Sequence, residues 1–139
     1  MKLSKNQQGP ASSSEAITNN VRVEVESQYV PNHSQPFEDV WSFHYTVRIT
    51  NEGEETVQLI SRHWIITDGN GKVEEVQGPG VVGEQPVLAP GESFTYTSGC
   101  RLQTSSGVVR GTYSMVTESD DHFDVEIAPF MLREPYTVH

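Results

Sequence analysis

The sequence contains a single cysteine, Cys100, so no disulfide can form within the chain. This usage fits a reducing compartment and favours a cytoplasmic location. A lone cysteine among strand-forming residues is typical of a small packed hydrophobe, and we do not expect Cys100 to be a catalytic nucleophile. The 139 residues suit one domain, which at this size can bury a sufficient core without disulfides.

Long apolar runs are also missing. No stretch approaches the ~18 apolar residues that a membrane-spanning helix needs. Lys2 and Lys5 lie near the N-terminus, but no apolar segment follows them, so this end lacks the pattern of a secretory signal. We therefore expect a soluble protein with no membrane insertion.

Basic residues are scarce. The chain has 9 Lys and Arg against 19 Asp and Glu, a formal net charge of −10. Residues 1–19 hold Lys2, Lys5 and Glu15 and carry +1, so residues 20–139 carry −11. A surface of this sign repels a phosphate backbone and argues against nucleic acid as a partner, whereas it suits basic partners or cations.

No window shows a sustained 3.6-residue period, so the sequence predicts almost no helix. Residues 1–19 are polar, and we predict a flexible N-terminal tail, with a place on a sheet edge as the alternative. Residues 20–139 are predicted to form one all-β domain of about seven short strands. The clearest alternation of apolar and polar residues lies at 21–25, 41–49, 93–97, 109–115 and 122–127.

This pattern predicts an antiparallel two-layer β-sandwich of the fibronectin type III-like (immunoglobulin-like) kind, with a barrel as the structural alternative. The absence of a Cys…Trp…Cys pattern argues against an antibody domain. Segment 56–67 changes parity midway, which indicates either a β-bulge or a strand covered on both faces. Five aromatic residues are expected on the inner faces: Trp41, Phe43, Tyr45, Phe94 and Tyr96.

A G-x-G-x-x-G motif occupies residues 78–83. In dinucleotide-binding enzymes this motif opens a helix, but Pro86 and Pro90 make a long helix implausible here. In one interpretation the glycines provide positive φ and close backbone approach in an ordered loop. In the other, exposed N–H groups form a nest for phosphate. Acidic residues flank the loop and oppose the nest: Glu74, Glu75 and Glu84.

Arg62 and Trp64 share a strand parity, so the two side chains can lie side by side. In one interpretation Trp64 is part of the core and the stem of Arg62 packs over it. The alternative is a shallow aromatic and cationic surface that binds a partner peptide or an anion.

Motifs for catalysis and metal binding are missing. The five histidines are scattered and lack the spacing of zinc ligands. Residues 120–124 (DDHFD) hold the densest oxygen ligands, but Asp is typical of a solvated turn. No G-x-S-x-G motif supports a nucleophile. We therefore predict no catalytic residue, no metal site and no cofactor, and a protein that is not an enzyme.

Several longer motifs follow one another along the chain. They are RHWIITDGNG at 62–71, EVQGPGVVGEQP at 75–86, PG at 90–91, YTSG at 96–99, then Gly107, Gly111, Tyr113 and Met115, and a last segment from Pro129. Over about residues 20–139 the chain thereby resembles the bacterial ApaG family, also called CorD. One departure is Val109, where the family pattern has Met; both are apolar, so only packing should differ.

The resemblance implies a fibronectin type III-like sandwich and points to the glycine motif as a family feature. The family's names carry two associations: genetic proximity to diadenosine tetraphosphate hydrolysis, and cobalt resistance with magnesium efflux. Neither is a reaction assigned to this domain. Related domains are attached to eukaryotic F-box and polymerase-interacting proteins. With the Arg62–Trp64 pair included, the candidates for ligand or partner binding are Gly78, Gly80, Gly83, Gln85, Arg62 and Trp64.

Two hypotheses follow. The first is a non-catalytic interaction module of the bacterial cytoplasm that binds an unknown protein partner and has an indirect role in divalent-cation (Co/Mg) handling. The alternative is a binder of, or enzyme acting on, a pyrophosphate-containing nucleotide such as diadenosine tetraphosphate, through the glycine loop at 78–83.

Overall fold

The computed structural model describes residues 12–135, which contain nine β-strands and two short 3-10 turns. The strands are β1 (Ser12–Thr18), β2 (Val21–Tyr29), β3 (Trp41–Asn51), β4 (Val57–Asp68), β5 (Val73–Pro79), β6 (Val87–Leu88), β7 (Ser93–Leu102), β8 (Ser106–Thr117) and β9 (His122–Arg133). The turns η1 (Pro31–His33) and η2 (Pro36–Glu38) connect β2 to β3. In this range, no helix has the length and apolar character needed to cross a membrane.

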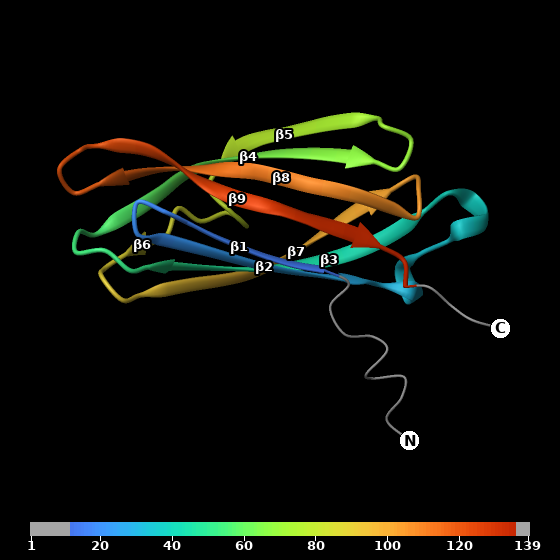
Figure 1. The fold of residues 1–139 in the computed structure, drawn as a ribbon, viewed down its shortest axis with the longest axis horizontal. Helices are drawn as coiled ribbons and strands as arrows, with labels where there is room; N and C mark the ends of the chain where they lie inside the picture. The colour runs from blue at the N-terminus through green and yellow to red at the C-terminus, as the bar shows by residue number, and fades with distance from the viewer. Residues whose placement is uncertain (1–11, 136–139) are drawn as a thin grey trace, which may run out of the picture.

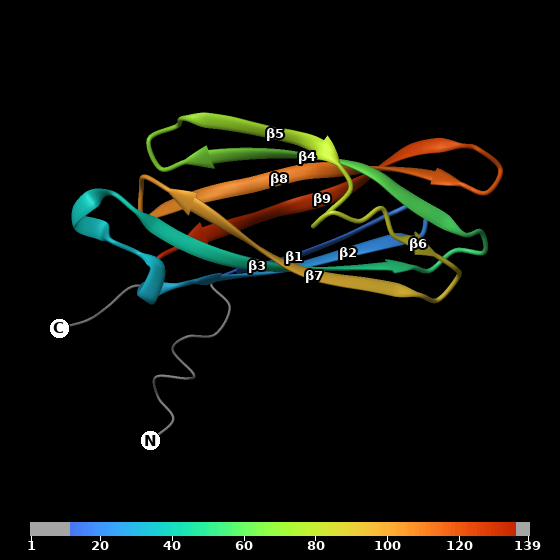
Figure 2. The same cartoon turned by 180° about the vertical axis from the view of Figure 1, so that it is seen from behind.

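The strands form two antiparallel sheets that lie face to face (Figures 1 and 2). The β3 sheet has the order β1-β2-β3-β7, and the β4 sheet has the order β5-β4-β8-β9, with β6 beside β4. Strand alternation directs one side of each strand into the space between the sheets. The predicted two-layer antiparallel β-sandwich is therefore confirmed.

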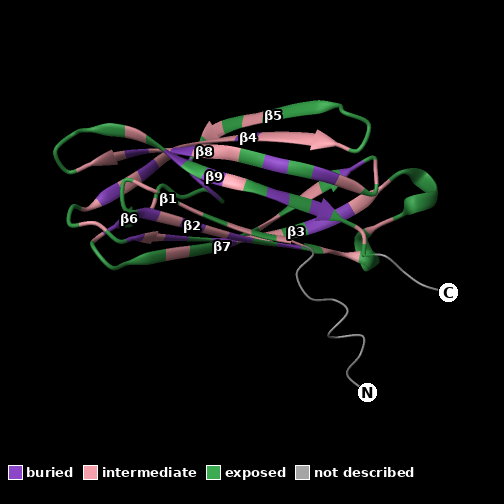
Figure 3. Cartoon of the chain, in the orientation of Figure 1, coloured by how far each residue is buried: buried purple, intermediate pink, exposed green. Residues whose placement is uncertain are grey.

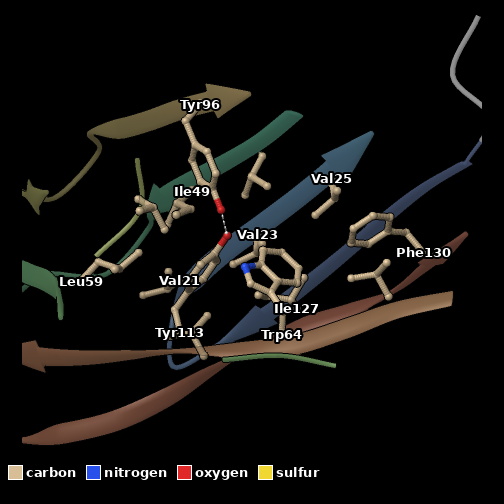
Figure 4. Close-up of a cluster of buried hydrophobic side chains, with 14 of the residues drawn as sticks. Val21, Val23, Val25, Ile49, Leu59, Trp64, Tyr96, Tyr113, Ile127 and Phe130 are labelled. Atoms are coloured by element: carbon tan, nitrogen blue, oxygen red, sulfur yellow. Dashed lines mark hydrogen bonds between the residues drawn. The ribbon is translucent and has the colours of Figure 1, made fainter. Parts of the chain in front are cut away.

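The core lies between the two inner faces, and buried residues alternate with more exposed ones most clearly along β2, β8 and β9 (Figure 3). Trp64 lies at the centre of an aromatic cluster (Figure 4). Its ring centroid is 5.4 Å from that of Tyr45, 6.0 Å from Tyr113 and 6.1 Å from Phe130. The hydroxyl groups of Tyr96 and Tyr113 form a hydrogen bond across the sheets, so neither buried hydroxyl lacks a partner.

The five aromatic residues predicted for the inner faces all contact this core. Phe43 and Tyr96 are buried, while the other three are half-buried and pack against the cluster. The three are Trp41, Tyr45 and Phe94. Cys100 is also partly buried against the core, as expected for a packed cysteine.

The parity change in segment 56–67 arises from a β-bulge. The pairing of β4 with β8 shifts register between Leu59 and Ser61, leaving Ile60 unpaired with β8. Before the bulge, Val57 and Leu59 face the core; after it, Trp64 does so. The extra residue switches the faces of the strand, and Arg62, which shares the parity of Trp64, is aimed between the sheets.

From residue 12 onward the prediction of a tail is wrong, and its alternative, a place on a sheet edge, is what the structure shows: β1 pairs with β2 along its whole length at the edge of the β3 sheet. The part at 1–11 lies outside the described residues. The prediction rested on composition, but β1 is held by backbone pairing with β2 and by hydroxyl groups rather than by apolar burial. Its hydroxyls reach the backbone of β9: Ser14 Oγ donates to Ala128 O at 2.8 Å, and Thr18 Oγ1 accepts from Glu126 N–H at 3.1 Å.

We expect deletion of residues 1–19 to lower the free energy of unfolding by about 1–3 kcal/mol relative to deletion of residues 1–11. The loss follows because the hydrogen bonds to β9 disappear and its edge loses its cover. Chemical denaturation of the two truncated proteins measures the difference. Equal stabilities would show that β1 contributes nothing to the fold.

Candidate functional site

The glycine loop at 78–83 docks on the bulge of β4. The carbonyl of Ile60, the bulge residue, accepts two hydrogen bonds, from Gly80 N–H at 2.8 Å and from Gln85 Nε2 at 2.9 Å. Leu59 N–H, beside the bulge, donates to Pro86 O at 3.0 Å. The unpaired backbone of the bulge is therefore used to hold the loop, and Gln85 has a structural role in this contact.

Arg62 fixes the start of the same loop. Its Nη1 donates to Pro79 O and to Gly80 O, each at 2.9 Å. The guanidinium lies over Gly78, where a Cβ would come within 3.1 Å of Nη2. No acidic side chain in the described part of the chain forms a salt bridge with Arg62. The site therefore holds an inward-facing cation whose bonding partners are neutral carbonyls.

The three candidate glycines have different environments. Gly78 makes room for the guanidinium, and Gly80 is buried with φ +62. Gly83 is exposed with φ +80, and a Cβ added there would have no neighbour within 4 Å. The N–H groups of Gly80, Val81 and Glu84 are already used within the protein, the last two in bonds to each other's residue. These bonds leave few donors for a phosphate and favour the conformational interpretation of the motif.

Replacing Gly80 with alanine is expected to destabilise the protein by about 1–3 kcal/mol. A Cβ there would lie 2.3 Å from Glu84 O, and the positive φ adds strain. Gly83→Ala is the matched control, because Gly83 also has a positive φ but an added Cβ there would touch no other atom. In thermal unfolding, the melting temperature of Gly80→Ala should be clearly lower than that of Gly83→Ala. Equal melting temperatures would contradict this account of the loop.

Beyond Arg62, a pocket of about 200 Å³ opens between β5 and β7, on one side of the sandwich. Its lining residues come from five strands: Tyr45, Arg62, Trp64, Ile66, Val76, Ser98, Gly99, Cys100 and Val109. Burial raises the pKa of the Tyr45 phenol, against the opposing effects of a hydrogen bond with Ser98 and the charge of Arg62. Burial, with the nearby Glu74 carboxylate, raises the pKa of Cys100 to about 11, so this thiol stays neutral and unreactive at pH 7.

Trp64 is 4% exposed, which places it in the core and excludes a shallow surface built on its ring. It still lines the inner wall of the pocket. The structure thus brings together Arg62, Gly78, Gly80 and Gln85 around the bulge, with Trp64 beside them, while Gly83 lies apart at the exposed tip of the loop.

The outer side of β5 is unpaired in the described part of the chain. The β4–β5 ladder is bounded by backbone bonds from Asp68 N–H to Lys72 O (2.9 Å) and from Gly80 N–H to Ile60 O (2.8 Å). Since bonded positions alternate in an antiparallel ladder, the even-numbered residues of β5 bond to β4. The remaining backbone groups point outward and define the β5 edge, formed by the exposed residues Val73, Glu75 and Gln77.

The opposite side of the sandwich is closed. Hydroxyl groups of β1 and β2 bond to the backbone of β9, including Ser27 Oγ to Met131 O at 2.6 Å and Met131 N–H to Ser12 Oγ at 3.0 Å. An edge covered in this way offers few groups to another strand. The other side of the sandwich, where β5 and β7 lie, shows no such cover in the described residues (Figure 2).

Comparison with known proteins agrees with this architecture. The family model described as the ApaG domain matches residues 31–117. The chain belongs to the ApaG family. It is 53% identical to Protein ApaG of Dechloromonas aromatica over 124 residues, covering 88% of this chain and 98% of that protein. It is 56% identical to Protein ApaG of Bordetella pertussis over 117 residues, covering 84% and 89%.

Solved structures of other proteins have a similar fold. A crystal structure of an ApaA protein from Bordetella pertussis matches with a TM-score of 0.82 and 56% identity, covering 84% of this chain and 95% of that one. The C-terminal domain of wzt matches with a TM-score of 0.50 at 8% identity, which shows a similar fold alone.

Sequence reasoning located the ApaG glycine motif but missed three pocket residues, Tyr45, Ser98 and Cys100, as neighbours of Arg62. The shared inward parity of these residues on β3 and β7 was visible in the sequence. Their position opposite Arg62 was not, because it depends on how the two sheets face each other. Residues 12–135 contain no group of three or more His, Cys, Asp or Glu placed to hold a metal ion.

Proposed function

We propose that this ApaG chain is a non-catalytic interaction module that binds an extended, basic segment of another protein along the β5 edge. The observation that carries the proposal is the asymmetry of the sandwich. Hydroxyl groups cover the β9 edge, whereas the backbone groups of the β5 edge have no strand beside them in the described residues. Strand addition to such an edge is a common way to recognise an extended peptide.

Exposed apolar side chains mark the same side of the β4 sheet. β5 and β6 both pair with β4 along one edge, and the glycine loop connects them. Among residues 12–135, three of the seven large apolar residues with exposed side chains lie between the start of β5 and the end of β6: Val73, Val82 and Val87. Apolar contacts of this kind add affinity to backbone pairing when a strand docks.

The acidic side chains beside the β5 edge favour a basic partner. Glu74, Glu75 and Glu84 are exposed along the stretch, and the whole chain carries −10. Carboxylates in these positions favour lysine or arginine on an incoming strand and oppose an acidic one. Any link to cobalt resistance or magnesium efflux would then be indirect, through the protein that is bound.

Two blocked peptides test the proposal, a basic one with the sequence KTVTVTK and an acidic one with the sequence ETVTVTE. NMR titration should give saturable shifts of the amides of Val73, Glu75 and Gln77 with the basic peptide and much smaller shifts with the acidic one. Equal responses to both peptides would refute charge selection. A change in oligomeric state in place of peptide binding would point to a second copy of the chain as occupant.

Proline substitutions show which of two strand edges, that of β5 or that of β7, binds the peptide. Gln77→Pro removes an outward N–H group of β5 without breaking a bond to β4, since the N–H of Gln77 does not belong to that ladder. Thr95→Pro is the matched control, because the same alternation places the Thr95 N–H on the outer side of β7. We expect Gln77→Pro to abolish binding and Thr95→Pro to retain it; the reverse result would move the docking site to β7.

A further inference from the structure

We infer that the pocket between β5 and β7 is a binding site for a carboxylate carried on a small apolar body. The pocket is lined by the cation of Arg62, by apolar side chains and by the hydroxyl groups of Tyr45 and Ser98. It is separate from the β5 edge, since it lies between the sheets, and the inference does not rest on strand addition.

The position of Arg62 is built by the fold. The β4 bulge turns this residue inward, and the missing side chain of Gly78 leaves space for its guanidinium. Two hydrogen bonds from Nη1 to carbonyls of the loop hold the head in place. An arginine fixed in this way loses little conformational entropy when it binds a planar carboxylate.

The charge of Arg62 lacks a counterion among the described residues. Its hydrogen-bond acceptors are the neutral carbonyls of Pro79 and Gly80, and no carboxylate lies within salt-bridge distance. A partly buried cation without an anion attracts one, and a guanidinium binds a carboxylate in a charge-assisted bond. The Tyr45 and Ser98 hydroxyls at the pocket supply further polar groups.

The rest of the lining indicates the body of the ligand. Trp64, Ile66, Val76 and Val109 present apolar surface, and the volume of about 200 Å³ is smaller than that of a typical drug-sized site. The neutral thiol of Cys100 adds no charge. A single carboxylate on a small ring or short aliphatic chain fits these surroundings, whereas a highly charged polyphosphate would be opposed by apolar walls and by the Glu74 carboxylate, whose charge acts on Cys100.

Benzoate is the probe for this site. NMR titration of the full chain should shift the indole N–H of Trp64 and the amides of Gly99 and Cys100 with saturation. Benzamide, which has the same shape without the charge, should bind about 10- to 100-fold more weakly, the factor for one charge-assisted hydrogen bond. Equal binding of benzoate and benzamide would overturn the inference, and stronger binding of inorganic phosphate would overturn the assigned ligand class.

Three variants locate the binding. Arg62→Gln should weaken benzoate about tenfold or more, but this change also removes the clamp on the loop. Val76→Phe therefore provides a second test, because a larger side chain in the pocket lining should exclude benzoate while Arg62 stays in place. Glu74→Gln should strengthen binding about twofold at low salt by removing a like charge. Benzoate binding that survives Val76→Phe unchanged would contradict the site.

The carboxylate could belong to a free acid or to the end of a protein chain, and a peptide arm distinguishes these sources. Acetyl-Gly-Gly-Phe with a free C-terminus is compared with its C-terminal amide. Shifts at Trp64 from the free peptide, lost with the amide, would assign the site to a chain terminus as well. Shifts from benzoate alone would assign it to small acids.

Discussion

Replacing Phe43 with alanine is expected to lower the free energy of unfolding by about 3–5 kcal/mol. Phe43 is 1% exposed in β3, and its ring centroid lies 5.5 Å from that of Tyr29. Removing the ring leaves a cavity between two sheets whose backbones are held by hydrogen-bonded ladders, so the surroundings cannot collapse into it. Equilibrium denaturation in urea measures the loss from the shift of the midpoint.

Phe37 supplies the matched control. It is the same residue type, but it lies in η2 with its side chain fully exposed to solvent. Phe37→Ala should change stability by less than about 0.5 kcal/mol, as for surface substitutions in general. Similar losses for the two variants would mean that the inner face of β3 has been assigned wrongly.

Replacing Gly111 with alanine is expected to lower the free energy of unfolding by about 3 kcal/mol, the upper end of the usual range for overpacking. Gly111 pairs with Trp64 in the centre of the β4 sheet, next to a register shift between β8 and β9. An added Cβ would lie 2.1 Å from His63 O, which belongs to the backbone of β4 and cannot rotate away. Two central strands must separate to admit one methyl group.

The control for Gly111→Ala is Gly99→Ala in β7. There the nearest atom to an added Cβ is Phe43 O at 3.6 Å, an ordinary contact, and φ is not positive. Thermal unfolding should show a large decrease in melting temperature for Gly111→Ala and little change for Gly99→Ala. A stable Gly111→Ala protein would imply that β4 and β8 are less closely paired than the structure shows.

Much of the fold could be predicted because a strand that is buried on one face alternates apolar and polar residues with a period of two. In β3, Phe43, Val47 and Ile49 share a parity and are all buried, while Arg48 between them is exposed. A parity change between Leu59 and Trp64 was also visible, with a bulge or a strand covered on both faces as its two explanations; the register shift of β4 decided for the bulge. Patterns of this kind depend only on neighbours in the chain, so the sequence shows them directly.

β1 escaped prediction for the opposite reason. Its residues alternate between half-buried and exposed, but the half-buried positions are Ser12, Ser14, Ala16 and Thr18, which add little apolar signal. The strand is held by pairing with β2 and by hydroxyl bonds to β9, more than a hundred residues further along the chain. A distant backbone that accepts or donates a hydrogen bond leaves no mark on the local sequence.

The candidate site divides in the same way. By itself, the sequence determined the acidic charge, the alternation that predicts a two-layer β architecture, the parity change in segment 56–67 and the position of the glycine loop, since each is a matter of composition or local pattern. Only the tertiary structure decided that Gly80 and Gln85 dock on Ile60, and that the β9 edge is covered by hydroxyl groups. The same holds for two features of residues 12–135: Arg62 faces a pocket without a counterion, and the β5 edge has no strand beside it. These features depend on which distant strands lie side by side, and that is settled by the packing of the two sheets.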